Sequence, residues 1–231
     1  ITYKANLDQA INNFNFGVSY MTGLRNPTLY EMFGTDNYGY SGNKNLKPEE
    51  SNTYEIYSNI NLYKNLNFSV RAFKSNIQNN IEYINNQYIN DTDNIDLNQS
   101  GLNSQIKFND QNTSLILSSS LLSSKKENGA DQLRRPRKNF AVNLRKKLKN
   151  NYFGKYNLSL NYNHYGKHSD THSSNFTTIE MDSTDIIDLY LNKKVGYKEY
   201  FIKITNLLNE NFQRPHGYNQ DGRIIKIGLR Y

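Results

Sequence analysis

Three histidines of this chain recur at the spacing that a metal-binding helix would use. His164, His168 and His172 are four residues apart, and on a helix this spacing would place three imidazoles on one face. The segment that holds them, NHYGKHSDTHSSN, contains Gly and Ser and is typical of a loop. We therefore interpret the spacing as coincidental and predict no metal site there.

A short acidic run offers a second place for a cation. Asp91, Asp93 and Asp96 lie near an expected turn, and carboxylate oxygens are ligands that Ca²⁺ prefers. Three short acidic side chains near a turn are more often ordinary solvated loop residues. The sequence therefore predicts no metal and no cofactor, with calcium left as an alternative.

Basic side chains crowd the segment 125–137, which begins on two lysines and ends on a group of arginines. The arginines are Arg134, Arg135 and Arg137. Guanidinium groups bind phosphates and carboxylates through paired hydrogen bonds, so this segment is a candidate anion-binding site. The alternative, which we favour from the sequence, is a solvated loop end.

No arrangement of residues indicates catalysis. The chain has 0 Cys, which excludes disulfides and thiolate metal sites. It contains no G-x-S-x-G motif, no Ser-His-Asp ordering and no paired carboxylates that stand out. We predict that the protein is not an enzyme; a hydrolase that uses His164 or His168 is the enzymatic alternative.

Composition narrows the class of protein. The formal net charge is +7, which fits an anionic partner but also follows from the abundance of Asn, Lys, Ile and Tyr, which all have AT-rich codons. The mean hydropathy is −0.84, and no run of apolar residues is long enough for a transmembrane helix. The opening ITYKANLDQA lacks the features of a signal peptide, and we expect the chain to be part of a longer protein.

Apolar and polar residues alternate along most of the chain. In LNFSVRAF and YNLSLNY every second residue is apolar, as in a strand with one apolar and one polar face. Helical spacing is weak throughout. The eleven strands expected from this alternation are 1–7, 11–22, 50–62, 66–84, 87–108, 113–123, 138–149, 155–166, 185–195, 199–208 and 222–231.

The connections between these strands alternate between short and long. The short ones are 8–10, 64–65, 109–112, 150–154 and 196–197, and the long ones are 23–49, 125–137, 167–184 and 209–221. A tight turn near 85–86 is the exception. An up-and-down meander with this alternation has its short turns at one end and its long loops at the other, which is typical of outer-membrane barrels.

Strand length separates a membrane barrel from a soluble sheet. A spanning strand needs about 9–11 residues, whereas soluble strands cluster near 5–6. Tyr and Phe also stand near the strand ends, where barrels place aromatic girdles. We predict an all-β, antiparallel, up-and-down transmembrane β-barrel of which this chain forms a part. A soluble basic β-protein that binds polyanions stays open as the alternative.

Two stretches carry a family resemblance. The segment 23–57, with Arg-Asn-Pro-Thr-Leu-Tyr-Glu followed by Gly-Asn-Lys-Asn-Leu-Lys-Pro-Glu, and the closing ITNLLNENF…GRIIKIGLRY resemble TonB-dependent outer-membrane receptors. The segment LRRPRKNFAVNL is similar to the cobalamin receptors within that family. The matching residues include Arg25, Pro27, Thr28, Glu31, Gly42, Asn43, Pro48, Glu49, Asn206, Leu207, Gly222, Arg223, Gly228 and Tyr231.

This resemblance implies a fold, a location and a function. Residues 1–231 would be the C-terminal part of a barrel of about 22 strands, with short periplasmic turns and long extracellular loops, in the outer membrane of a bacterium. The N-terminal plug and the segment that contacts TonB have no counterpart in the chain. The function implied is uptake of a scarce nutrient, either cobalamin or an iron–siderophore, with a diffusion porin as a further alternative and no nucleic-acid partner.

The resemblance also assigns roles to particular residues. Long extracellular loops would capture the ligand, so Tyr30, Phe33, Tyr38 and Tyr40 could stack on its rings, or could pack within their own loop. The arginines of 125–137 could bind lipopolysaccharide phosphates, or could face plug carboxylates. The closing residues Gly228, Leu229 and Tyr231 resemble the signal that the outer-membrane insertion machinery recognises.

Overall fold

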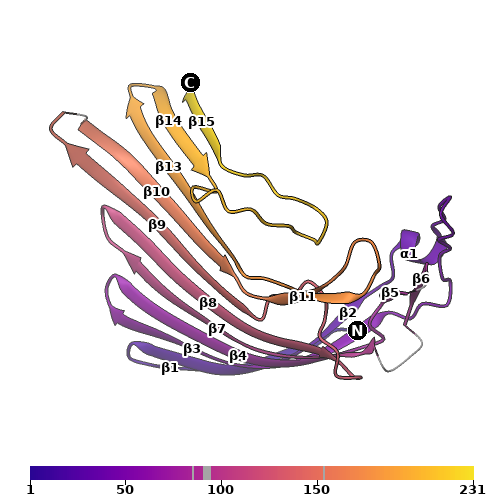
Figure 1. Ribbon diagram of the computed structural model, residues 1–231. Coiled ribbons are helices and arrows are strands. Elements are labelled where there is room, and N and C mark those ends of the chain that lie inside the picture. Colours follow the sequence, from indigo (N-terminus) through magenta and orange to yellow (C-terminus); the bar gives the residue numbers. More distant parts are fainter. Residues whose placement is uncertain (85, 91–94, 153) are drawn as a thin grey trace. The chain divides into compact units, whose positions relative to one another are not determined.

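Eleven strands form one antiparallel sheet in the computed structural model, which describes residues 1–84, 86–90, 95–152 and 154–231. The strands follow one another in chain order, as Figure 1 shows, so the predicted up-and-down meander of eleven strands is confirmed. The strands are β1 (Lys4–Ile11), β2 (Phe14–Arg25), β3 (Glu49–Tyr63), β4 (Leu66–Gln78), β7 (Leu97–Asn109), β8 (Thr113–Lys126), β9 (Lys138–Asn150), β10 (Gly154–Tyr165), β13 (Thr184–Val195), β14 (Lys198–Thr205) and β15 (Ile224–Arg230).

The chain forms two compact units. The first comprises Ile1–Ser58, Arg71–Leu102 and Leu122–Gln132, and the second comprises Asn59–Val70, Asn103–Leu121 and Leu133–Tyr231. Within the long connections the first unit carries helix α1 (Leu29–Phe33) and the hairpin β5 (Glu82–Ile84)–β6 (Gln87–Ile89). The second carries the hairpin β11 (His168–Thr171)–β12 (Thr178–Met181). No helix in the described ranges is long and apolar enough to span a membrane.

Two of the predicted strands are longer than the strands observed in the structure. The sequence predicted continuous strands over 66–84 and 87–108, but β4 ends at Gln78, where the next residue, Asn79, adopts a φ of +52°. A left-handed residue turns the chain out of the pleat. On either side of the tight turn expected near 85–86, β5 and β6 pair Ile84 with Gln87 but form a small sheet of their own; residue 85 itself lies outside the described residues.

The first hairpin is shifted along the chain from its predicted place. The sequence placed a turn at 8–10, whereas β1 runs through Ile11 and pairs that residue with Phe14. Asn12 carries a φ of +52°, which a two-residue hairpin turn requires and which Asn tolerates better than most residues. The turn therefore falls on the two asparagines rather than on Asp8.

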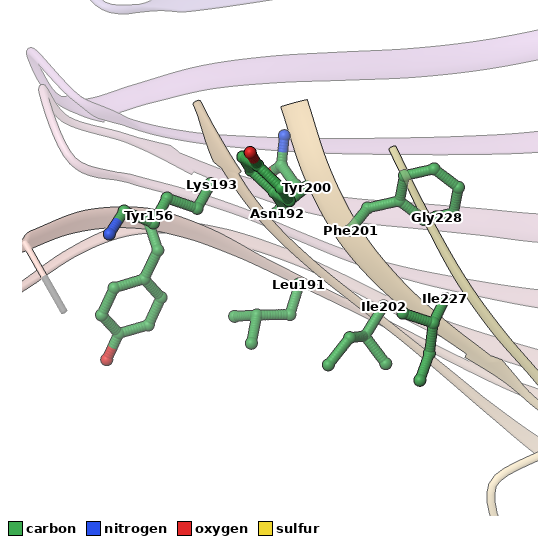
Figure 2. Close-up of a pocket in the computed structure, with 9 residues that line it drawn as sticks. All are labelled: Tyr156, Leu191, Asn192, Lys193, Tyr200, Phe201, Ile202, Ile227 and Gly228. Atoms are coloured by element: carbon green, nitrogen blue, oxygen red, sulfur yellow. The ribbon is translucent and has the colours of Figure 1, made fainter. Parts of the chain in front are cut away.

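The second unit separates aliphatic and polar residues onto opposite faces of its strands. One register row across six adjacent strands is wholly aliphatic: Leu115, Leu144, Leu160, Leu189, Ile204 and Ile225. The row beside it, on the other face, is polar: Ser114, Arg145, Ser159, Tyr190, Lys203 and Lys226. In Figure 2, Leu191, Ile202 and Ile227 lie on one side of the strands and Phe201 on the other.

The aliphatic face does not form a soluble core. Among the described residues the buried apolar side chains are Tyr40, Leu46, Ile95 and Leu97, and all of them lie outside the aliphatic row. Ile225 and Ile227 are 59% and 77% exposed. A soluble sandwich would bury such a face against a second sheet, whereas a barrel strand in a membrane presents it to hydrocarbon.

Candidate ligand-binding loops

A cluster of tyrosines organises the long loop of the first unit. The Tyr40 ring stacks on Tyr30 with ring centres 4.8 Å apart, and it contacts Tyr83 and Tyr88 at 5.9 and 5.8 Å. The Tyr40 hydroxyl donates a hydrogen bond of 2.6 Å to the Tyr30 carbonyl oxygen. Burial raises the pKa of Tyr40, and the nearby Tyr30 hydroxyl adds to the effect. This ring joins α1 to the hairpin β5–β6.

Helix α1 is held by a capping box and by an arginine. The Thr28 side chain accepts a hydrogen bond from the Glu31 backbone N–H, and the Glu31 carboxylate accepts one from the Thr28 N–H at 2.6 Å. Arg25 bridges the Glu31 carboxylate at 3.2 Å and Glu49 at 2.6 Å. Burial alone would raise the pKa of Glu31, but the hydrogen bonds from Thr28 and Arg25 outweigh it and lower that pKa.

A buried asparagine closes the same loop from its other side. Asn90 is 5% exposed and donates to the carbonyl oxygens of Lys47 and Asn79, at 2.6 and 3.1 Å. It also accepts from the Lys47 N–H at 3.2 Å. This role of Asn90 could not be predicted from the sequence, because an Asn in a polar run looks like its neighbours until folding brings together residues some forty positions apart.

The predicted aromatic ligand residues are divided between surface and interior. Tyr38 is 90% exposed, Tyr30 and Phe33 are about half exposed, and Tyr40 is 4% exposed. The Lys44 ammonium lies 5.7 Å from the centre of the Phe33 ring. Three of the four rings are therefore exposed while Tyr40 is buried, and contact of these rings with a ligand stays a prediction.

A buried carboxylate ties together three loops of the second unit. Asp170 is fully buried and accepts hydrogen bonds from Arg134 Nε at 2.8 Å, the His216 N–H at 2.9 Å and the Thr171 N–H at 2.7 Å. Burial alone would raise the pKa of Asp170, but these donors, with Arg134 foremost, hold it below its ordinary range. The last of these loops also contacts the end of β10, since the Arg214 guanidinium lies 3.9 Å from the centre of the Tyr165 ring.

Two arginines of the predicted cluster form ion pairs with carboxylates of the second unit. Arg134 binds Asp170, and Arg137 lies 3.6 Å from the Glu180 carboxylate. Arg135 also has an interaction partner. The cluster therefore contributes to the packing of its own loops, and the binding of an external anion by these arginines stays a prediction.

A polar cavity of about 590 Å³ lies between the second unit's loops 179–184 and 210–219. Its lining includes Glu180, Asp182 and Glu210, and Lys167 lies 3.2 Å from the Asp182 carboxylate at its rim. The Lys167 pKa is raised by the hydrogen bond to Asp182. The walls of this cavity come from two separate loops, so no local pattern in the sequence predicts it.

The histidines spaced four residues apart make separate contacts in the structure. His164 Nδ1 lies 2.8 Å from the Asp185 carboxylate, and His172 packs against His216 with ring centres 4.5 Å apart. Nδ1 of His172 and of His216 each accept a backbone N–H. Among the described residues no group of three or more His, Cys, Asp or Glu could hold a metal ion. Asp91 and Asp93 of the alternative calcium site lie outside the described residues.

The closing strand places its three predicted signal residues in different surroundings. Gly228 pairs with Phe201, and a Cβ at Gly228 would meet that ring at 2.5 Å. Leu229 lies on the other face, opposite Tyr200. Tyr231 is 82% exposed, and the Lys198 ammonium lies 5.6 Å from the centre of its ring.

Comparison with known proteins decides the family. The sequence profile described as "TonB dependent receptor-like, beta-barrel" matches residues 1–207. The chain belongs to this family of TonB-dependent receptor β-barrels. The family resemblance and the bacterial outer-membrane location that the sequence predicted are confirmed, and the aliphatic face of the strands is the face toward lipid. No curated protein sequence matches the chain.

Solved structures share the barrel fold at low sequence identity. The FrpB iron transporter from Neisseria meningitidis is 13% identical with a TM-score of 0.75, and the match covers 99% of this chain and 38% of that one. FpvA of P. aeruginosa, bound to pyoverdines, is 14% identical with a TM-score of 0.77, over 98% and 32%. The ferric yersiniabactin uptake receptor FyuA from Yersinia pestis is 14% identical with a TM-score of 0.71, over 99% and 35%. The chain thus spans about a third of the length of these receptor structures.

The TonB-receptor motif residues have clear structural tasks in this chain. Arg25, Glu31 and Glu49 form the ion-pair network that fixes α1. Asn206, which is 4% exposed, donates to the carbonyl oxygens of Glu210 and Asp221, at 2.8 and 3.2 Å, and so folds the last long loop back on itself. The motifs therefore shape the loops and do not by themselves identify a ligand.

Proposed function

We propose that this chain is the C-terminal part of an outer-membrane receptor that binds a scarce nutrient and passes it inward with energy supplied through TonB. The nutrient is an iron–siderophore or cobalamin. The observation that carries the proposal is the exposed aromatic surface of the long loop in the first unit, built on a fixed cluster of tyrosines. Such a surface stacks on flat, ring-bearing ligands.

The names of the matching structures support the iron–siderophore form of the proposal. FrpB is an iron transporter, and FyuA is a ferric yersiniabactin uptake receptor. Cobalamin stays as the second ligand because the segment LRRPRKNFAVNL resembles cobalamin receptors. The protein makes and breaks no bond in this role, so we propose that it is not an enzyme.

The remaining partners follow from the same proposal. A plug domain and the segment that binds TonB are proposed to belong to the rest of the receptor. The basic segment 125–137 is a candidate for contact with lipopolysaccharide phosphates. The closing residues Gly228, Leu229 and Tyr231 are proposed as the signal for the outer-membrane insertion machinery. Deleting Tyr231 from the complete receptor should lower the surface level measured by antibody labelling of whole cells, and an unchanged level would contradict that role.

Ligand titration of the complete receptor tests the aromatic surface. Binding would be recorded by intrinsic fluorescence quenching or calorimetry, with a ferric siderophore and with cobalamin in separate experiments. Tyr38→Ala should weaken the ligand that binds by about 2–10-fold, since one aromatic stacking contact contributes about 0.5–1.5 kcal/mol. Tyr152→Ala is the matched control, because Tyr152 is 93% exposed and lies in the short turn between β9 and β10.

Two outcomes would count against this proposal. Saturable binding of neither ligand class would contradict a nutrient receptor and would favour a diffusion porin. Equal effects of Tyr38→Ala and Tyr152→Ala would show that the aromatic surface of the 23–49 loop does not contact the ligand.

A further inference from the structure

An apolar groove lies on the lipid-facing side of β10, β13, β14 and β15. Its volume is about 490 Å³. Figure 2 shows Tyr156, Leu191, Ile202 and Ile227 projecting to the same side and leaving open space between them. Because this side of the barrel faces hydrocarbon, the groove is a place for a lipid chain rather than for a water-soluble ligand.

The groove changes character along the strands. Leu191, Ile202 and Ile227 share one register row, so its inner part is aliphatic. The next row toward the short turn at 196–197 pairs Lys193 with Tyr200. The groove therefore runs from a hydrocarbon-like floor to an aromatic and cationic end, the order in which a phospholipid presents its acyl chain and its phosphate.

Positive charge is concentrated at that end without acidic partners. Lys193 and Lys198 are half-buried, and Lys146 lies on the same face in the row of Leu191. No ion pair joins any of these lysines to another described residue. Lys193 lines the groove, and Lys198 lies one row nearer the short turn, with its ammonium group 5.6 Å from the centre of the Tyr231 ring. Long lysine stems pack along apolar surface while the ammonium group reaches the polar boundary.

The acidic groups nearby point elsewhere. Glu199 lies on the opposite, lumenal face, where it accepts hydrogen bonds of 2.7 Å from the Tyr190 hydroxyl and from Asn192 Nδ2. On the lipid face of β9, β10, β13, β14 and β15, as far as the structure describes them, the one carboxylate is Asp185, at the long-loop end of β13. Anionic headgroups are therefore favoured at the short-turn end and disfavoured at the other.

We infer that this groove binds one anionic glycerophospholipid of the periplasm-facing leaflet. One acyl chain lies along Leu191, Ile202 and Ile227, and the phosphate lies between the ammonium groups of Lys193 and Lys198. Lipopolysaccharide occupies the other leaflet, where the long loops emerge and Asp185 would repel its phosphates. This site is separate from the nutrient-binding loops and does not depend on the proposed function.

Native mass spectrometry of the complete receptor tests the inference, with phosphatidylglycerol and phosphatidylcholine of equal chain length as probes. The wild-type receptor should retain one phosphatidylglycerol in preference to phosphatidylcholine. Each lysine near an anionic headgroup contributes about fivefold in affinity, so Lys193→Gln/Lys198→Gln should weaken phosphatidylglycerol binding by about 25-fold. Phosphatidylcholine binding should change little.

Matched controls separate this site from general charge effects. Lys194→Gln/Lys203→Gln removes the same charge from the lumenal face of β13 and β14, and its phosphatidylglycerol affinity should equal that of wild type. Ile202→Trp fills the groove and should weaken both lipids. Equal retention of the two lipids by the wild type, equal losses in the two lysine variants, or unchanged binding in Ile202→Trp would each overturn the inference. Heat-modifiable mobility on gels checks that every variant has folded. If Ile202→Trp does not fold, the two lysine variants alone test the inference.

Discussion

Replacing Asp170 by Asn should open the loops of the second unit without unfolding its strands. The carboxylate accepts three hydrogen bonds while fully buried. An Asn keeps one acceptor oxygen but would turn its amide N–H₂ toward either the His216 N–H or the Arg134 side chain, both of which are donors. At least one donor then loses its hydrogen-bond partner.

The size of the effect follows from these contacts. A hydrogen bond to a charged group contributes about 1.5–3 kcal/mol. The Arg134 side chain is 60% exposed, so solvent screens its charge and the lower part of that range applies. We expect the free energy of loop opening to fall by about 2 kcal/mol, which raises the open population by about 30-fold.

Hydrogen exchange measured by mass spectrometry on the complete receptor reads this population. The Arg134 N–H, which donates to the Ser169 carbonyl oxygen at 2.7 Å, and the Thr171 and His216 N–H groups should exchange about 30-fold faster in Asp170→Asn. Peptides from β9 and β10 should be unchanged.

Asp182→Asn is the matched control for this experiment. Asp182 is 90% exposed, and its ion pair with Lys167 is exposed as well, so its contribution to loop stability should be small. If Asp170→Asn and Asp182→Asn speed exchange equally, the buried carboxylate does not hold the loops together and the reasoning fails.

Three further outcomes follow from the same contacts. The folded-state pKa of Asp170 lies below its unfolded value of about 3.9, so its contribution to loop stability is present above pH 4 and is lost as pH falls through the folded-state pKa. Hydrogen exchange in 166–176, corrected for intrinsic rates, should therefore be constant from about pH 8 to 5 and accelerate only below about pH 4. Acceleration near pH 6 would point to the histidines instead. Leu160→Arg should destabilise the barrel by about 2–4 kcal/mol in a urea refolding titration, whereas Asn161→Arg, on the lumenal face, should cost less; equal losses would refute the assignment of faces. Thr28→Ala should weaken α1 by about 1 kcal/mol, seen as about fivefold faster exchange of the Glu31 N–H, and Thr35→Ala in the same loop should leave that amide unchanged.

The strands could be predicted from the sequence because the alternation of apolar and polar residues that marks a strand is local. Alternation fixes which residues share a face within any one strand, and the register rows of the second unit keep that sorting across six strands. The capping box of α1 also leaves a local signal in the sequence, since Thr28 and Glu31 stand three residues apart, yet the helix was not predicted. It was missed because weak helical periodicity over a five-residue helix hides a genuine cap signal.

The loops could not be read in this way, because their contacts join distant residues. Asp170 meets Arg134 and His216 across 36 and 46 positions, and Asn90 meets Lys47 across 43. Sequence patterns do not distinguish these buried polar residues from the many exposed Asn and Asp around them, nor do they show that Tyr40 packs inside while Tyr38 faces outward.

The sequence by itself thus determined the strand meander, the two faces of its strands and the receptor family. A period of two and short motifs are local signals, so they can be recognised without knowing which residues are neighbours in space. Only the tertiary structure decided which aromatic rings are exposed, which carboxylate is buried among the loops, and that an apolar groove has Lys193 in its lining. Those features depend on burial and on charges brought together by strand pairing, and burial is a property of the folded chain and not of any segment of it.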